Sequence, residues 1–142
     1  MVLKWLWRKV GLEAPAPPDT GRWGEQQAEE MLRRKGYRIL GRRLRIGLRD
    51  EIDLVARDGE ILVFVEVKTR RREDFGRPLD SVDRRKRQVL SRAAVRYLRR
   101  LKYPPVCFRF DVVEVIGSMA DPPPKLRHVE KAFDLDRRYY VP

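Results

Sequence analysis

Cysteine and histidine are almost absent from this sequence, which holds one of each among 142 residues. The single cysteine, Cys107, permits neither an internal disulfide nor a cysteine-based metal cluster, and this fits a protein of the reducing cytoplasm. The sequence also lacks a Gly-rich phosphate loop, a Ser-His-Asp arrangement and a zinc-binding pattern. These absences exclude several common classes of enzyme site, and we expect His128 to be incidental rather than a general base.

Long apolar stretches are missing as well, since none approaches the roughly 20 residues that a transmembrane helix needs. Basic residues interrupt the apolar part of residues 1–10, MVLKWLWRKV, and no convincing small-residue cleavage site follows, which argues against a signal peptide. Residues 14–18, APAPP, read as a stiff linker. We expect residues 1–19 to be a loosely attached tail, with a docking or membrane-surface segment as the alternative.

Positive charge is what the sequence has in excess. Lys and Arg number 33 against 21 Asp and Glu, which gives a formal net charge of +12. Such a surface attracts polyanions, because each phosphate that pairs with a basic side chain releases bound counterions. Nucleic acid, DNA above all, is therefore the first partner to consider, although ribosomal and membrane-surface proteins share this bias.

Apolar periodicity predicts one α/β domain over residues 20–118, with a mixed sheet flanked by helices. The expected order is helix, three strands, helix, strand. The expected elements are a helix at 22–35, strands at 37–46, 51–57 and 60–69, a helix at 83–102 and a strand at 106–116. The prolines at 122–124 are expected to isolate a C-terminal extension, 119–142, in which 126–133 could form an edge strand.

The strongest local signal is Asp-Gly at 58–59, between two β-rich runs, which predicts a tight hairpin. With Asp58-Gly59 as the two-residue turn, Asp53 pairs with Phe64. Residues two apart on a strand share a face, and so do directly paired residues. The hairpin therefore places Asp53 on the same face as Glu66 and Lys68.

Two carboxylates on one sheet face suit a hard cation such as Mg²⁺ or Mn²⁺, with water and a substrate phosphate as further ligands. Such an ion can polarise a phosphoryl oxygen and lower the pKa of a bound water. Lys68 could then orient that water or stabilise charge that develops on the phosphate. The alternative is a structural ion-pair cluster of Asp53, Glu66 and Lys68.

The two expected helices each offer one more charged residue to this face. Glu25 lies on the inner flank of the first helix and could add a metal ligand, directly or through water. Lys86 lies about one turn before Leu90, on the inward stripe of the second helix, and could contact phosphate. A snorkelling lysine that only covers the helix is the alternative for Lys86.

Arginines surround the expected site and are candidates for nucleic-acid binding. The arginines after the third strand and those at the start of the second helix could bind phosphates, and solvated surface charge is the alternative. The candidates are Arg70, Arg71 and Arg72 after the third strand, Arg84 and Arg85 at the start of the second helix, and Arg43 in the basic first strand.

The motifs at these positions resemble the YraN-like family of uncharacterised bacterial proteins. The matching residues are Gly24-Glu25, Gly36-Tyr37, Glu51-Ile52-Asp53, Phe64-Val65-Glu66-Val67-Lys68 and Lys86, and the likeness covers residues 21–116. The family is similar to the restriction-endonuclease-like superfamily, which includes archaeal Holliday junction resolvases. The resemblance implies a restriction-endonuclease-like core and, because resolvase-like relatives act as dimers, a homodimer.

The resemblance also assigns roles within the site. It implies that Asp53, Glu66 and the backbone carbonyl of Val67 bind the metal, that Lys68 is the catalytic lysine, and that Glu25 is the helix carboxylate. The sequence departs from the family at two positions. Asp50 stands where Gly is usual, and Arg43 stands where Asn is frequent. Both positions lie outside the metal triad, so the departures affect turn geometry and substrate contacts more than catalysis.

Three functions follow from these observations. The first is a Mg²⁺-dependent nuclease that cuts DNA, with branched or damaged DNA as the substrate class. The second is a non-catalytic module that uses the same fold to bind nucleic acid. The third is a structural interaction protein whose basic surface meets an acidic partner.

Overall fold

The structure is a computed structural model that describes residues 20–71 and 82–142. The predicted tail at 1–19 and the candidate Arg72 lie outside the described residues. The elements follow the predicted order, and the edge strand that was considered for 126–133 is present at the C-terminal end. They are α2 (Thr20–Arg34), β1 (Arg38–Ile46), β2 (Asp50–Asp58), β3 (Ile61–Arg70), α3 (Arg84–Arg100), β4 (Cys107–Ser118) and β5 (Asp121–Phe133).

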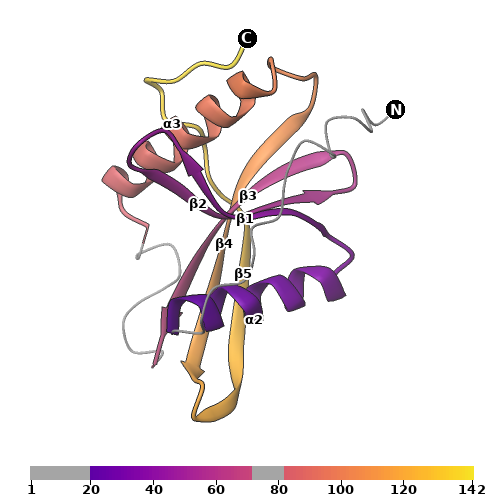
Figure 1. The fold of residues 1–142 in the computed structure, drawn as a ribbon, viewed down its shortest axis with the longest axis vertical. Coiled ribbons are helices and arrows are strands. Elements are labelled where there is room, and N and C mark those ends of the chain that lie inside the picture. Colours follow the sequence, from indigo (N-terminus) through magenta and orange to yellow (C-terminus); the bar gives the residue numbers. More distant parts are fainter. Residues whose placement is uncertain (1–19, 72–81) are drawn as a thin grey trace.

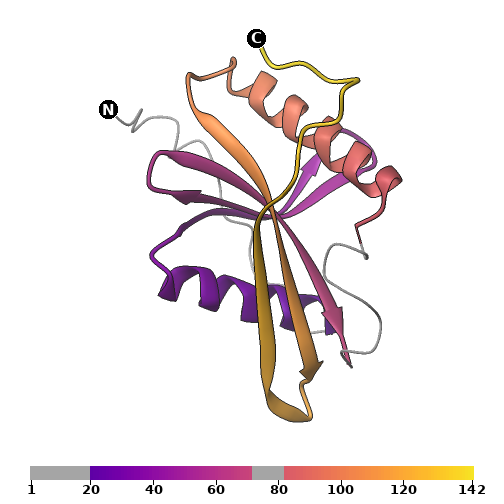
Figure 2. The same cartoon turned by 180° about the vertical axis from the view of Figure 1, so that it is seen from behind.

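The five strands form one mixed sheet in the order β1-β2-β3-β4-β5. Only β3 and β4 run parallel, because the connection between them passes through α3. Helices α2 and α3 lie on opposite sides of the sheet (Figure 1), and the view from behind gives the same arrangement (Figure 2). The predicted α/β class, with a mixed sheet flanked by helices, is confirmed.

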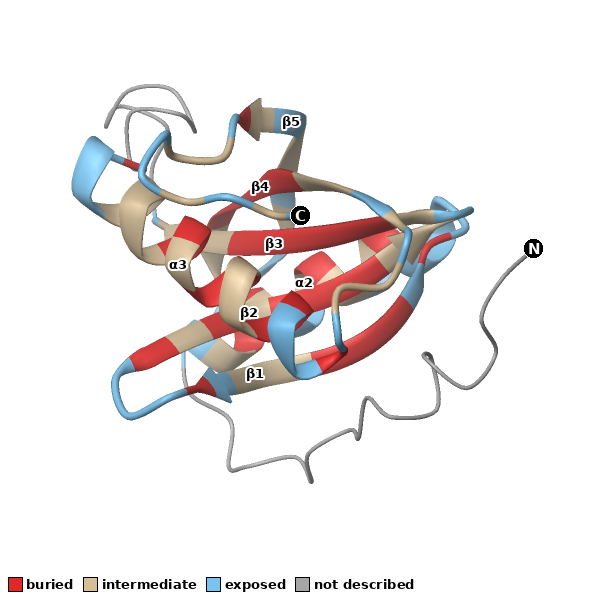
Figure 3. Ribbon diagram, turned by 90° about the horizontal axis from the view of Figure 1, so that it is seen from above, coloured by how far each residue is buried: buried red, intermediate tan, exposed pale blue. Residues whose placement is uncertain are grey.

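Two apolar layers hold the sheet between the helices. On β3, Leu62 and Phe64 pack into the layer under α3, whereas Val63 and Val65 pack into the layer under α2. This alternation follows from the two-residue period of a strand. Residues of both faces are buried in the middle of β3 (Figure 3). Glu66 and Lys68 follow on the same strand, so they lie next to the buried centre of the fold.

The β2–β3 hairpin forms, but its predicted register is wrong by two residues. Asp58 pairs with Ile61, and Val55 pairs with Phe64, so the two-residue turn is Gly59-Glu60. Gly59 adopts a φ of +58°, which a glycine accepts without steric cost. A shift of two residues equals the period of the strand, so the side chains of the paired residues 54–58 and 61–65 stay on their predicted faces.

The C-terminal strand is longer than predicted. β5 begins at Asp121 and includes the prolines at 122–124, so the expectation that these prolines isolate the last segment is wrong. Strand β5 lies at the edge of the sheet, where a proline without an N–H group disturbs no ladder on its open side. Within the described residues, neither helix is long and apolar enough to cross a membrane.

Candidate active site

The site lies where β2 separates from β3. The β2–β3 register runs from Asp58 back to Leu54 and goes no further toward the start of β2. The β1–β2 pairs on either side of Arg43 and Asp53 are regular, but Arg43 has a left-handed φ of 42°. Ile52 packs under α3 whereas Leu54 packs under α2, so β2 twists at this point. Asp53 therefore occupies a fork in the sheet that side chains from both helices can approach.

Asp53 and Glu66 meet in this fork. The backbone N–H of Val67 donates to Oδ2 of Asp53 at 2.8 Å, which orients the Asp53 carboxyl group. Burial raises the pKa of Asp53 well above its usual range, and a hydrogen bond and charge repulsion from Glu66 raise it further. Two carboxyl groups in contact repel each other when both are ionised, so a cation between them would be favoured.

Two lysines converge on the second of these acids. Lys68 Nζ lies 3.3 Å and Lys86 Nζ lies 3.4 Å from the same Oε2 atom of Glu66. The Glu66 side chain is 4% exposed, whereas those of Lys68 and Lys86 are 31% and 37% exposed. Glu66 is therefore buried, Asp53 is partly exposed, and the lysines lie where the site opens to solvent.

Glu25 stands beside the fork on α2. A Cβ added to Gly24 would lie 1.9 Å from Oγ1 of Thr69, so this glycine allows the start of α2 to approach the end of β3. Glu25 accepts a hydrogen bond from Arg43 Nε at 2.6 Å. Burial raises the pKa of Glu25 even though Arg43 opposes this effect, and the Glu25 charge in turn raises the pKa of Asp53. Glu25 thus contributes negative charge to the site while it pairs with Arg43.

The remaining arginine candidates divide into two kinds. Arg70 pairs with the buried Glu114 at 3.3 Å, and Arg43 pairs with Glu25, so both hold the structure around the site. Arg71, Arg84 and Arg85 are exposed near it, at the end of β3 and the start of α3.

Glu114 is a residue of the site region that the sequence reasoning did not select. Its side chain is 1% exposed, and it lies beside Lys68 in the parallel β3–β4 register. Besides Arg70 it pairs with Arg127 at 3.7 Å. An acid inside the apolar run at 112–116 was the available signal, because a buried carboxylate needs cationic partners.

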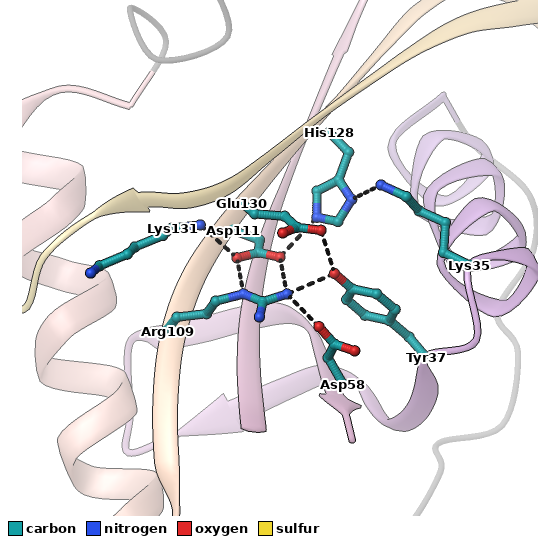
Figure 4. A network of polar contacts seen from close by, with 8 residues as sticks. All are labelled: Lys35, Tyr37, Asp58, Arg109, Asp111, His128, Glu130 and Lys131. Carbon is teal, nitrogen blue, oxygen red and sulfur yellow. Dashed lines mark hydrogen bonds and ion pairs between the residues drawn. The ribbon is translucent and has the colours of Figure 1, made fainter. Parts of the chain in front are cut away.

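His128 lies away from the fork, in a polar network between the start of β1 and the edge strand (Figure 4). Lys35 Nζ lies 2.8 Å from its Nδ1 and can only donate, so Nε2 donates to Asp111 at 2.8 Å. Arg109 contacts both Asp111 and Tyr37. His128 is thus a structural partner of the buried Asp111, and it is not incidental.

A model of the uncharacterised protein family UPF0102 matches residues 24–115, most of the chain. The chain belongs to this family. The YraN-like resemblance is thereby confirmed, because the two names describe one family. A UPF0102 protein of Symbiobacterium thermophilum is 53% identical over 96 residues, which cover 67% of this chain and 80% of that protein. A relative from Chlorobaculum tepidum is 42% identical over 122 residues, 83% of this chain and 94% of that protein.

The acids at the fork suit some metals better than others. In the part of the chain that the structure describes, no group of three or more His, Cys, Asp or Glu side chains could hold a metal. Structural zinc needs such a group. Mg²⁺ needs only one or two carboxylates, because it keeps several waters and takes substrate phosphate oxygens. The pair of Asp53 and Glu66 therefore fits Mg²⁺ or Mn²⁺.

Proposed function

We propose that this UPF0102 protein is a divalent-metal-dependent nuclease that cuts phosphodiester bonds in DNA, with branched or damaged DNA as its substrate class. The observation that carries the proposal is the contact between Asp53 and Glu66 in a fork of the sheet that Lys68 and Lys86 also reach. Acids and lysines this close to one another provide both metal ligands and phosphate ligands.

The residues that would hold Mg²⁺ or Mn²⁺ are Asp53, Glu66 and the backbone carbonyl of Val67. The bound ion would polarise a phosphoryl oxygen and lower the pKa of a coordinated water. Asp53 is ready for this role because the N–H group of Val67 fixes one of its oxygens at 2.8 Å. Glu25 adds negative charge from α2 and could bind the ion through water.

Lys68 and Lys86 would act on the substrate. Their ammonium groups lie 3.3 and 3.4 Å from Glu66 and are partly exposed, so each can shift from this carboxylate to a phosphate oxygen. Lys68, on the same strand as Glu66, would orient the attacking water and stabilise the charge that develops on the phosphate. Lys86, on the opposing helix, would hold the phosphate against the site.

The surroundings of Lys68 favour a polyanionic substrate. Arg84 and Arg85 are exposed one turn or less before Lys86. A hollow of about 520 Å³ at the end of β3 is lined in part by Arg70 and Arg71, close in sequence to Lys68. A nucleic-acid strand that enters the fork would meet the exposed Arg71 at the end of β3 and Arg84 and Arg85 at the start of α3, on either side of the scissile phosphate.

Cleavage of a panel of DNA substrates tests the proposal. Linear, flapped, single-stranded and four-way-junction DNA would be incubated with Mg²⁺ or Mn²⁺ and with EDTA. We expect wild type to cleave DNA only when the metal is present, and we expect Asp53→Ala and Glu66→Ala to abolish this cleavage. Circular dichroism should show that both variants are folded. Absence of cleavage on every substrate with either metal, or equal cleavage by the variants, would contradict the proposal.

One observation favours the second candidate, a non-catalytic nucleic-acid-binding protein. Two lysines already lie within ion-pair distance of Glu66, so the cluster is balanced without a metal. This candidate predicts that the protein binds DNA with the same affinity in EDTA and in Mg²⁺, and that it cuts none. The homodimer implied by the family resemblance stays a prediction, and analytical ultracentrifugation with and without DNA tests it.

A further inference from the structure

The turn between β1 and β2 carries a leucine that no part of the described structure covers. Leu48 is 99% exposed, although leucine is normally a core residue. Its neighbours Gly47 and Arg49 are exposed as well, and Arg45 is exposed near the end of β1. A fully exposed leucine among basic residues suggests a contact with something that is both apolar and anionic.

This turn is anchored on the second half of α3. The adjoining Asp50 is 2% exposed and accepts two hydrogen bonds of 2.8 Å from Arg92. Arg96 reaches the same carboxylate at 3.7 Å, and Arg100 donates to the backbone oxygen of Arg45 at 3.4 Å. The helix therefore presents the turn in a fixed position, with Leu48 at its tip.

A hollow of about 550 Å³ lies between the turn and α3. Every charged residue that lines it is an arginine, and these are Arg49, Arg96, Arg99 and Arg100. Asp50, the acid that adjoins the turn, is already paired with Arg92. The planar fork of a guanidinium group matches the oxygens of a phosphate, so the hollow suits a phosphodiester backbone.

We propose that this turn is a nucleic-acid wedge: the arginines of the hollow hold backbone phosphates while Leu48 inserts between two neighbouring bases. Proteins that kink nucleic acid use apolar side chains in this way, and unstacking costs least where base pairing is already interrupted. A lipid surface fits less well, because a single leucine adds little membrane affinity.

The position of the wedge connects it to the fork. Leu48 precedes Asp53 by five residues, which is roughly 16 Å along an extended chain. A duplex advances about 3.4 Å per base pair. A nucleic acid in the fork could therefore reach Leu48 within about five base pairs. The proposal rests on the nucleic-acid binding in the proposed function, and it does not depend on cleavage.

Binding in EDTA separates the wedge from the nuclease. The probe is a DNA three-way junction with 2-aminopurine at the branch, whose fluorescence rises when the base unstacks. We expect wild type to raise this fluorescence at saturation, and Leu48→Ser to bind roughly tenfold more weakly without raising it. Cys107→Ser changes another exposed, uncharged side chain, at the start of β4 and outside both hollows, and should behave as wild type.

Two further measurements test the role of the arginines and the lipid alternative. Combined Arg99→Gln and Arg100→Gln should reduce the slope of log affinity against log salt by up to about 0.9 for each lost phosphate contact. Equal affinity and fluorescence for wild type and Leu48→Ser would overturn the wedge. The wedge would also be overturned if wild type bound tightly to anionic phosphatidylserine vesicles, and if Leu48→Ser abolished this binding but left junction binding unchanged. Loss of Mg²⁺-dependent cleavage with the wedge intact would refute only the nuclease.

Discussion

Lys86 on α3 and Lys68 on β3 share one atom, Oε2 of Glu66, at 3.4 and 3.3 Å. The start of α3 makes this possible. Asp83 caps the helix by accepting a hydrogen bond from the backbone N–H of Lys86 at 2.8 Å, so the cap residue and the lysine are fixed together. When a substrate phosphate takes the place of the Glu66 carboxylate as their partner, one lysine can stabilise the transition state while the other holds the phosphate.

The two lysines should therefore fail in different ways when they are removed. We expect Lys68→Ala to lower kcat by about 10²–10³, because charge stabilisation in the transition state is lost. Lys86→Ala should mainly raise KM, by roughly tenfold, because it holds the substrate phosphate in both states. Steady-state cleavage kinetics measure both effects, and Arg34→Ala at the exposed end of α2 is the charge-matched control. Identical losses in kcat for both lysine variants would contradict this division.

Gly24 should tolerate no side chain as long as Thr69 stands opposite. Gly24→Ala would place Cβ 1.9 Å from Thr69 Oγ1, and we expect it to cost roughly 1–3 kcal/mol of unfolding free energy. Adding Thr69→Ala should recover most of this loss, because the next nearest atom, Thr69 Cβ, is 3.1 Å away. Urea unfolding of the two single variants and the double variant forms the cycle. Additive losses would show that the two residues do not meet.

Arg43 should be a strand position at which glycine gives a more stable protein than alanine, the reverse of the usual order. Its φ of 42° lies in the left-handed region, where a Cβ atom costs about 1–2 kcal/mol. Arg43→Gly should therefore be more stable than Arg43→Ala by about 1 kcal/mol, although both lose the ion pair with Glu25. At Arg45, whose φ is not positive, the order should reverse. Chemical unfolding measures the four variants, and the same order at both positions would refute the interpretation.

Asp111 should make the fold sensitive to acid. Burial alone would raise the pKa of Asp111, but hydrogen bonds from His128, Arg109 and the Lys131 N–H group together lower it. An acid with a lowered folded pKa stabilises the protein above its unfolded pKa of about 3.9, and this contribution is lost as the pH falls through the folded value. Tyr37 and Asp58 also face this network through Arg109.

Asp111→Asn tests this linkage. At pH 7 we expect a loss of roughly 3–5 kcal/mol, because the variant breaks the ion pair that Arg109 makes with a fully buried carboxylate. The difference from wild type should shrink as the pH falls below about 4. Thermal unfolding at a series of pH values measures it. A constant difference from pH 7 to pH 2.5 would mean that the Asp111 charge does not stabilise the fold.

The fold was predictable from the sequence because its signals are local. The apolar stripe of α3 has a clear helical period, the run at 61–65 is continuously apolar and follows an Asp-Gly turn signal, and both elements are found within two residues of the prediction. The hairpin kept its faces despite the wrong turn, since the error equals one strand period. The extent of β5 was missed because proline normally argues against a strand, and only its edge position permits it.

The site was predictable in part, and for a similar reason. The placement of Asp53, Glu66 and Lys68 on one face follows from alternation along two strands. The twist at Arg43, the fork at Asp53 and the pairing of Arg43 with Glu25 depend on contacts between distant elements. Glu114 was missed because only the β3–β4 register places it next to Lys68.

The central claim is that Asp53 and Glu66 form a divalent-cation site, and titration of Mn²⁺ followed by calorimetry tests it most directly. We predict one Mn²⁺ per chain in wild type, with affinity at least about tenfold lower in Asp53→Asn and Glu66→Gln. Glu29→Gln, on the same helix as Glu25 but paired with Arg42 and Arg33, should bind as wild type does. Equal Mn²⁺ binding in all four proteins, or no binding in wild type, would contradict the account.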